Sequence, residues 1–299
     1  MIAVKLMGGL GNQMFQYALG RKLALKHGTS LMLDTSALGV EIPNTTFREY
    51  ELKHFSIDAS TGTSQDIFME LFQEVGGVKF NLAKTKRKLG FSLKAPNLIK
   101  ERGFAFQPQA LSARNNSYLQ GYWQSEKYFK DIRPQLLNDF SPREPVGKIN
   151  QDLIDEFRNL DVVSVHVRRG DYVTAPKIAE AHGHCTLEYY RRAFQAIEDS
   201  IETPCYCFFS DDIEWVKQNI KVKGQGFYVD HNHDMGYKDL FLMAHCKHHI
   251  IANSSFSWWG AWLGRNPDKI VVRPERWFNV SHLDTSDLCP AEWLLVPNS

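Results

Sequence analysis

The sequence predicts an α/β protein with parallel sheets and two domains. At the N-terminus, residues 2–6 form an apolar run, a glycine loop follows, a helical pattern spans Gln13 to Lys26, and residues 30–34 form a second apolar run. Strand, glycine loop, helix and strand make a βαβ unit, which indicates a parallel sheet. The same alternation restarts at Val162, and 299 residues are enough for two domains.

The first half is regular only at its two ends. In the first helix, Phe15, Leu19 and Leu23 recur at helical spacing and predict a core-facing stripe. Residues 36–118 are expected to form loops and short helices. Residues 118–123 predict another strand, which leads into a loop rich in Tyr and Trp.

The second half repeats strand and helix in turn. Prolines gather between residues 131 and 160, and we place the boundary there, giving domains of 1–145 and 146–299. Apolar strand patterns and amphipathic helix patterns alternate after it. The strands are expected at 162–167, 205–210, 226–230, 249–252 and 270–273, and the helices at 187–201, 213–220, 238–246 and 256–263.

The composition excludes several classes of protein. A formal net charge of +1 does not indicate a nucleic-acid binder, and 43% hydrophobic with 23% charged residues is typical of a globular protein. Five cysteines without regular spacing argue against a disulfide framework and suit a reducing cytosol. No apolar stretch reaches the roughly 18 residues of a membrane span. Residues 1–6 are too short for the apolar region of a signal peptide.

A basic segment lies between Lys79 and Arg102, where eight basic residues face one acid, Glu101. Two interpretations remain open for it. It is either a solvated face or a surface that meets an anionic membrane or a lipid-linked acceptor.

The loop after the first strand carries Gly9 and Gly11, and Asp34 ends the second strand. This spacing resembles a dinucleotide fingerprint, but Met14 stands where the third glycine is needed, so NAD or FAD is not favoured. The glycines still let a ligand approach the backbone closely. The helix N-terminus, with Asn12 and Gln13, favours an anion or a polar sugar group.

His166 lies near the end of the strand at 162–167, and Arg168, Arg169 and then Gly-Asp-Tyr follow it. Ligands of parallel sheets bind beyond the carboxyl ends of strands, and guanidinium groups pair with phosphate oxygens. When a glycosyl bond to a nucleoside diphosphate breaks, the leaving group gains negative charge, which fixed cations stabilise. The alternative is an arginine pair held in surface salt bridges.

Two further strand ends carry polar groups. Asp211 and Asp212 follow the strand at 205–210, where they can accept hydrogen bonds from guanine or ribose, while Ser210 or Asp211 can cap the next helix. Asn253, Ser254 and Ser255 precede the last predicted helix, whose N-terminus is suited to phosphate. The tryptophans of that helix are expected mostly in the core.

The sequence offers no standard metal motif. Its histidines and cysteines lack the usual zinc spacings, and the chain contains no Asp-x-Asp element of the kind that holds a nucleotide-bound divalent ion. We therefore expect no metal.

Together these segments resemble the α-1,2-fucosyltransferases of glycosyltransferase family 11. The matching segments follow in order along nearly the whole chain. They are MGGLGNQMFQYALGRKLA (7–24), GYWQS (121–125), VSVHVRRGDYV (163–173), FFSDDIEWV (208–216), DLF (239–241) and IIANSSFSWWGAWL (250–263).

The resemblance implies a GT-B-like fold of two Rossmann-like domains with a central cleft. The first domain lies on the acceptor side and the second binds GDP-fucose. It also implies metal-free, inverting transfer of L-fucose from GDP-β-L-fucose to the 2-hydroxyl of a terminal galactose. Animal members carry an N-terminal membrane anchor and stem that we do not recognise here. We therefore expect a bacterial enzyme of O-antigen synthesis, cytoplasmic or peripheral at the inner face of the membrane. The sequence does not indicate an oligomeric state.

Roles follow from the matched motifs. Catalytic roles fall on Arg168, Arg169, Asp171 and Asn12, with Asp171 either the general base on the acceptor hydroxyl or a support for the arginine loop. Binding of the donor falls on the two arginines together with Gly9, Gln13, His166, Asp211, Asp212, Asn253, Ser254 and Ser255.

Three alternatives remain. The chain is otherwise a fucosyltransferase of α-1,6 or O-fucosyl type, a catalytically inactive carbohydrate-binding homologue, or a Rossmann oxidoreductase. The GDY and SFSWWG elements disfavour the first, the intact arginine pair disfavours the second, and Met14 disfavours the third.

Overall fold

The computed structural model describes all residues except 42–45, 77–96, 171–182, 281 and 299. The chain divides into two compact units. The first contains Met1–Ser141 and the short segment Ser286–Leu288, and the second contains Pro142–Thr285 and Cys289–Ser299. Each unit has its own parallel sheet, so the α/β class with two Rossmann-like units is confirmed.

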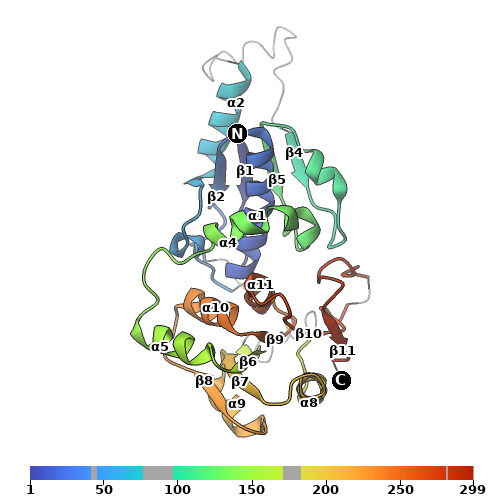
Figure 1. Ribbon diagram of the computed structural model, residues 1–299. Coiled ribbons are helices and arrows are strands. Elements are labelled where there is room, and N and C mark those ends of the chain that lie inside the picture. The colour runs from blue at the N-terminus through green and yellow to red at the C-terminus, as the bar shows by residue number, and fades with distance from the viewer. Residues whose placement is uncertain (42–45, 77–96, 171–182, 281, 299) are drawn as a thin grey trace. The chain divides into compact units, whose positions relative to one another are not determined.

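The sheet of the first unit has the strand order β3-β2-β1-β5-β4, and all its pairs are parallel (Figure 1). Its strands are β1 (Ile2–Lys5), β2 (Leu31–Asp34), β3 (Ser60–Gly62), β4 (Asn97–Lys100) and β5 (Ser117–Gln120). Its helices are α1 (Leu10–His27), α2 (Ser64–Gly76) and α4 (Arg133–Asp139), with 3-10 turns η1 (Leu52–His54), η2 (Pro108–Ser112), η3 (Glu126–Tyr128) and η4 (Lys130–Ile132).

The core of the first unit explains why α1 lies so close to the sheet. Phe15, Leu19 and Leu23 are fully buried, as their spacing predicted. Gly20 faces the sheet, because a Cβ there would lie 2.5 Å from a methyl group of Val4. Any larger residue would push the helix off β1.

The sheet of the second unit has the order β11-β10-β9-β6-β7-β8, again with parallel pairs. Its strands are β6 (Asp161–Val167), β7 (Pro204–Ser210), β8 (Gly226–Val229), β9 (His248–Ile250), β10 (Val271–Pro274) and β11 (Leu294–Val296). Its helices are α5 (Lys148–Phe157), α8 (Leu187–Glu198), α9 (Ile213–Asn219), α10 (Gly236–His245) and α11 (Ser255–Leu263).

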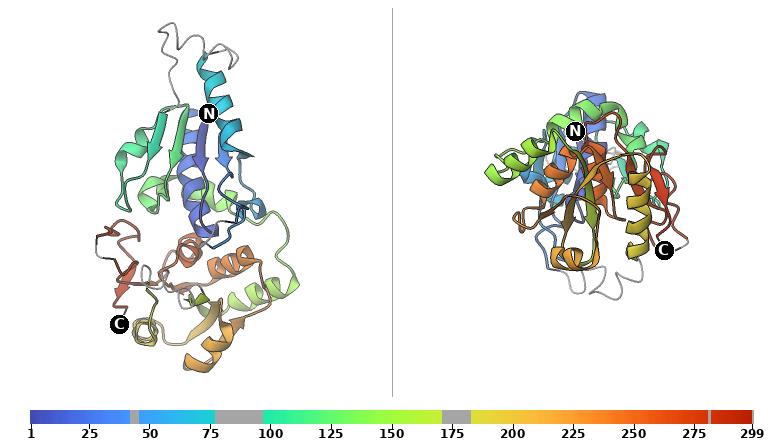
Figure 2. Two further views of the ribbon diagram at one scale, coloured as in Figure 1. Left: turned by 180° about the vertical axis from the view of Figure 1, so that it is seen from behind. Right: turned by 60° about the horizontal axis from the view of Figure 1, so that its bottom comes forward.

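Alternate residues of β6 face opposite layers of the second unit. Val163, Val165 and Val167 pack with residues of α8, whereas Val162 packs with residues of α5 and α10. Figure 2 shows α8 separated from α5 and α10 by the strands. Because β6 is buried on both faces, valines stand at both alternating sets of positions, and only Asp161, Ser164 and His166 are polar.

Candidate functional site

The side on which successive strands are added to the second sheet changes at β6. From β6 the chain builds β7 and β8 on one side, and it then crosses to build β9, β10 and β11 on the other. Loops at the carboxyl ends of β6 and β9 therefore leave toward opposite sides, and ligands of parallel sheets bind at such a switch point. Residues 168–170 and 252–255 lie at this point.

The two arginines after β6 are held by carboxylates from the next strand. Arg168 Nη1 lies 2.7 Å from Asp211 Oδ2, and the backbone N–H of Arg169 donates to Asp211 Oδ1 at 2.9 Å. Arg169 Nε donates to Asp212 Oδ2 at 3.1 Å. The side chains of Arg168 and Asp211 are each 26% exposed, so the guanidinium is anchored yet reachable from solvent.

An aromatic ring supports the second guanidinium. Arg169 Cζ lies 3.7 Å from the centre of the Trp215 ring in α9, a cation–π contact. Asp212 caps α9 by accepting a hydrogen bond from the backbone N–H of Trp215 at 3.2 Å. A side chain caps this helix as expected, but the cap is Asp212 and not Ser210 or Asp211. Ser210 instead donates to the carbonyl of Val167 at 2.7 Å and ties β7 to β6.

Gly170 leaves room for Asp211. A Cβ at Gly170 would lie 2.4 Å from Asp211 Oδ2, so any side chain there would displace this carboxylate. Glycine is thus needed here for the space of the carboxylate that holds Arg168, which the sequence alone does not reveal.

His166, two residues before Arg168, is buried and only 6% exposed. Its ring centre lies 5.5 Å from that of Phe256 in α11, and its backbone carbonyl accepts from the Tyr190 hydroxyl at 3.0 Å. Its Nδ1 has no hydrogen-bond partner among the described residues. Burial, and secondarily the charge of Arg168, lowers the pKa of His166 to about 3, so the ring is neutral at physiological pH.

This neutral histidine predicts acid sensitivity. Its folded pKa lies below the ordinary value near 6.5, so its contribution to stability is complete above pH 6.5 and is lost as pH falls toward 3. Between pH 7.5 and 5.0 the free energy of unfolding of His166→Gln should fall less than that of the wild type, by up to about 2 kcal/mol. Urea unfolding at both pH values measures this, with the exposed His184→Gln as control. Equal losses in wild type and His166→Gln contradict a buried neutral ring.

At the start of α11, Ser254 is the N-cap and accepts from the backbone N–H of Phe256 at 3.3 Å, and Ser255 is the first helical residue. The Asn253 side chain is 1% exposed and donates to the carbonyl of Trp277 at 3.2 Å. Asn253 thus fixes the loop that presents Ser254. Trp258 and its neighbours in α11 are buried, as expected.

In the first unit, the order in which strands are added to the sheet likewise changes side between β1 and β5. Gln124 Nε2, in the loop after β5, donates to Asn12 Oδ1 at 2.7 Å, which joins two matched motifs. Gly9 packs beneath Arg48, since a Cβ there would lie 3.5 Å from Arg48 Nη1. Arg48 was not identified from the sequence, because no motif surrounds it.

The N-terminus of α1 is closed by the protein itself. The Glu51 carboxylate accepts from the backbone N–H of Leu10 at 3.1 Å, and burial raises the pKa of Glu51. Gln13 is fully buried, and its amide bonds to backbone groups of Gly8, Glu49 and Glu51. An internal carboxylate therefore occupies the place that the sequence offered to a bound anion.

The Asp34 carboxylate is also occupied by hydrogen bonds inside the first unit. It is fully buried and accepts hydrogen bonds from the hydroxyls of Ser64 and Tyr118. A ribose cannot share a carboxylate in that position, which agrees with the absence of a third glycine at Met14.

Some predictions fall outside the described residues. Asp171 lies there, as do Lys79 and most of the basic segment that follows it. Within the ranges that the structure describes, no three His, Cys, Asp or Glu side chains are grouped to hold a metal ion. The helices of those ranges include none that is both long and apolar enough to cross a membrane. The contacts of guanine, ribose and phosphate with the predicted residues stay predictions.

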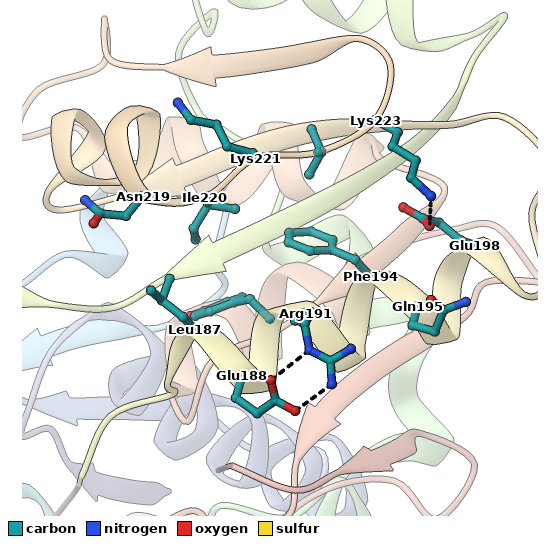
Figure 3. Close-up of a pocket in the computed structure, with 12 residues that line it drawn as sticks. Leu187, Glu188, Arg191, Phe194, Gln195, Glu198, Asn219, Ile220, Lys221 and Lys223 are labelled. Atoms are coloured by element: carbon teal, nitrogen blue, oxygen red, sulfur yellow. Dashed lines mark hydrogen bonds and ion pairs between the residues drawn. The ribbon is translucent and has the colours of Figure 1, made fainter.

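A hollow of about 560 Å³ lies elsewhere on the second unit, between α8 and residues 219–223 (Figure 3). Four of its five charged lining residues form two ion pairs, and Lys221 donates to the carbonyl of Lys217 at 2.6 Å. Glu188 binds Arg191 through two hydrogen bonds of 2.7 Å, and Glu198 lies 3.8 Å from Lys223. The arginines at the end of β6 do not line it.

Comparison with known proteins places the chain in a family. The model of glycosyl transferase family 11 matches residues 1–296. An O-antigen biosynthesis glycosyltransferase of Escherichia coli, WbnK, is 35% identical over 91% of this chain and 93% of its own length. An α-1,2-colitosyltransferase of Escherichia coli is 31% identical over 99% and 98%. Human galactoside α-(1,2)-fucosyltransferase 1 is 28% identical over 48% of this chain and 42% of its own length.

Among solved structures, NodZ α-1,6-fucosyltransferase soaked with GDP-fucose aligns with a TM-score of 0.49 and 15% identity. The alignment covers 88% of this chain and 92% of that one. The apo form of POFUT1 aligns with a TM-score of 0.48 and 12% identity, over 93% and 98%. The match of the family model along nearly the whole sequence decides the assignment: the chain belongs to glycosyltransferase family 11.

Proposed function

We propose that this chain transfers L-fucose from GDP-β-L-fucose to the 2-hydroxyl of a terminal galactose, with inversion at the sugar carbon. The observation that carries the proposal is the arginine pair at the carboxyl end of β6, where Asp211 fixes Arg168 and both Asp212 and Trp215 fix Arg169. Membership of family 11 and relatives named as α-1,2-transferases support the reaction type and the linkage.

In the proposed reaction, the galactose oxygen forms a bond to C1 of fucose while the bond from C1 to the β-phosphate oxygen breaks. The electron pair of that bond leaves with GDP, whose diphosphate gains negative charge. Arg168 stabilises this charge directly, because its guanidinium is already oriented and needs no reorganisation. Arg169 completes the positive edge, and the N–H groups at the start of α11 near Ser254 and Ser255 approach the phosphates.

The remaining roles follow from the contacts. Asp211 and Asp212 position the arginines and are candidates for ribose or guanine, and His166 supports the arginine loop without adding charge. The acceptor proton passes to Asp171 or to solvent.

The first unit takes the acceptor side in this proposal. Asn12 and Gln124 offer amides to sugar hydroxyls, and Gly9 lets the Arg48 guanidinium approach the backbone beside them. Gln13 acts through the loop that it holds, because its amide is already bonded to the backbone.

A second donor is favoured by one relative. The α-1,2-colitosyltransferase aligns with 99% of this chain, and colitose is L-fucose without its 3-hydroxyl. The phosphate-binding residues proposed here serve either GDP-sugar equally, because both donors share the diphosphate.

One assay separates these possibilities. The protein is incubated with GDP-fucose or GDP-colitose and a panel of galactose-terminated oligosaccharides, in EDTA and then with added Mn²⁺, followed by linkage analysis. We expect α-1,2-linked fucose and turnover unchanged by EDTA, because the proposed site neutralises the diphosphate with arginines. Exclusive use of GDP-colitose would move the assignment to the second donor. Strict dependence on Mn²⁺, or release of no GDP with any acceptor, contradicts the proposal.

A further inference from the structure

The first unit has a hollow at the edge of its sheet that none of the predicted roles uses. It has a volume of about 640 Å³ and lies between the edge strand β4 and η2, which Figure 1 shows beside each other. Lys100, Arg102, Gln107 and Trp123 are among the residues that line it. The described lining residues include two cations, Lys100 and Arg102, and no acid.

Trp123 has an unusual backbone at this hollow. Its φ angle is +58°, a left-handed conformation that bulky residues rarely adopt. The Glu101 carboxylate holds the conformation by accepting the backbone N–H groups of Tyr122 at 2.6 Å and Trp123 at 2.9 Å. Gly121 leaves room for this contact, since a Cβ there would lie 2.4 Å from Glu101 Cβ. Strain that the surroundings hold so firmly is typical of functional sites.

Two hydrogen-bond donors at the hollow have no acceptor. Trp123 is fully buried, and its indole N–H has no partner among the residues described; the same holds for Gln107 Nε2. The rest of Gln107 is fixed, because its Oε1 accepts from the backbone N–H of Arg102 at 3.2 Å and its own N–H donates to Tyr128 at 2.8 Å. Buried donors without acceptors are rare in native proteins and call for a ligand, a water or an ion.

We propose that this hollow binds an anionic group of the acceptor glycan, a phosphate or a sugar carboxylate carried next to the accepting galactose. Lys100 and Arg102 supply the charge, and the two lining residues Trp123 and Gln107 carry N–H groups that lack an acceptor among the described residues. This inference rests on the proposed function, because it names the acceptor class of the same enzyme.

The test compares three galactosides that differ only beside the galactose: one neutral, one bearing a phosphate and one joined to a uronic acid. For the wild type, the kcat/KM for a charged acceptor should exceed that for the neutral one by about 10-fold, roughly the effect of one charge-assisted contact. In Arg102→Gln and Gln107→Glu this ratio should fall to near one. Arg114→Gln, an exposed arginine of the same unit that does not line the hollow, should keep the wild-type ratio.

Preference for the phosphate or for the uronic acid identifies the source of the anion. Equal kcat/KM for all three acceptors in the wild type, or an unchanged ratio in both variants, overturns the inference. Calorimetric titration of the charged galactosides into the donor-free protein keeps the test separate from catalysis. If no transfer occurs but the charged glycans bind and Gln107→Glu abolishes that binding, the hollow stands and the proposed reaction fails. If no binding occurs although transfer is normal and unselective, only the hollow fails.

Discussion

Replacement of Arg168 by alanine is expected to lower kcat by roughly 10²- to 10⁴-fold, which corresponds to about 3 to 5 kcal/mol of lost transition-state stabilisation. Charge appears on the diphosphate only as the sugar bond breaks, so the loss should fall on kcat more than on the KM for the donor. Release of GDP in the presence of acceptor measures it. The fold should persist, because the Arg168 side chain is 26% exposed and fills no core position.

Arg191→Ala is the matched control for this prediction. Arg191 is also an arginine of the second unit and is also paired with a carboxylate, Glu188, but its side chain is 67% exposed and lies on α8. Its loss should leave turnover unchanged. A folded Arg168→Ala protein that releases GDP at a rate near that of the wild type would remove the basis of the proposed mechanism.

Gly170→Ala is expected to lower kcat/KM by roughly 10- to 100-fold, the effect of about 1.4 to 2.7 kcal/mol on the barrier. The added methyl group would meet Asp211 Oδ2 at 2.4 Å, so the carboxylate that orients Arg168 must move. Small displacements of orienting groups cost this much even when no reacting atom is touched.

Gly226→Ala provides the comparison. Gly226 begins β8 in the same unit, and a Cβ there meets its neighbours at ordinary distances of 3.6–3.7 Å. Turnover by that variant should stay within a factor of two of the wild type. If Gly170→Ala is as active as Gly226→Ala, the carboxylate is not needed to orient the arginine.

The repeated pattern of strand and helix was predictable where strands are buried on both faces. β6 and β7 are mostly apolar, and the amphipathic α8 begins at Leu187 as expected. Most edge strands escaped prediction because they are short and half exposed, although the edge strand β8 (Gly226–Val229) was predicted. β3 reads Ser-Thr-Gly, and β4 alternates partly buried and exposed residues over only four positions. The C-terminal strand β11 was missed for the same reason.

The strand ends that carry the candidate site could be predicted from the sequence, but the contacts between its side chains could not. Arg168 and Asp211 stand at strand ends in the sequence, whereas their 2.7 Å contact depends on β6 and β7 being neighbours in register. The largest difference between expectation and structure concerns the amide of Gln13, which was expected to face a ligand but is buried and bonded to the backbone. Gln13 bonds to the backbone at Glu49, 36 residues away in the sequence, and that partner has no local signal. The left-handed backbone of Trp123 is likewise a tertiary effect.

The most direct measurement is a crystal structure of this protein with bound GDP-fucose or GDP. We expect the diphosphate at the carboxyl end of β6, with Arg168 within hydrogen-bond distance of a β-phosphate oxygen and the start of α11 beside it. A nucleotide seated away from β6, with Arg168 still bound only to Asp211, would contradict this expectation.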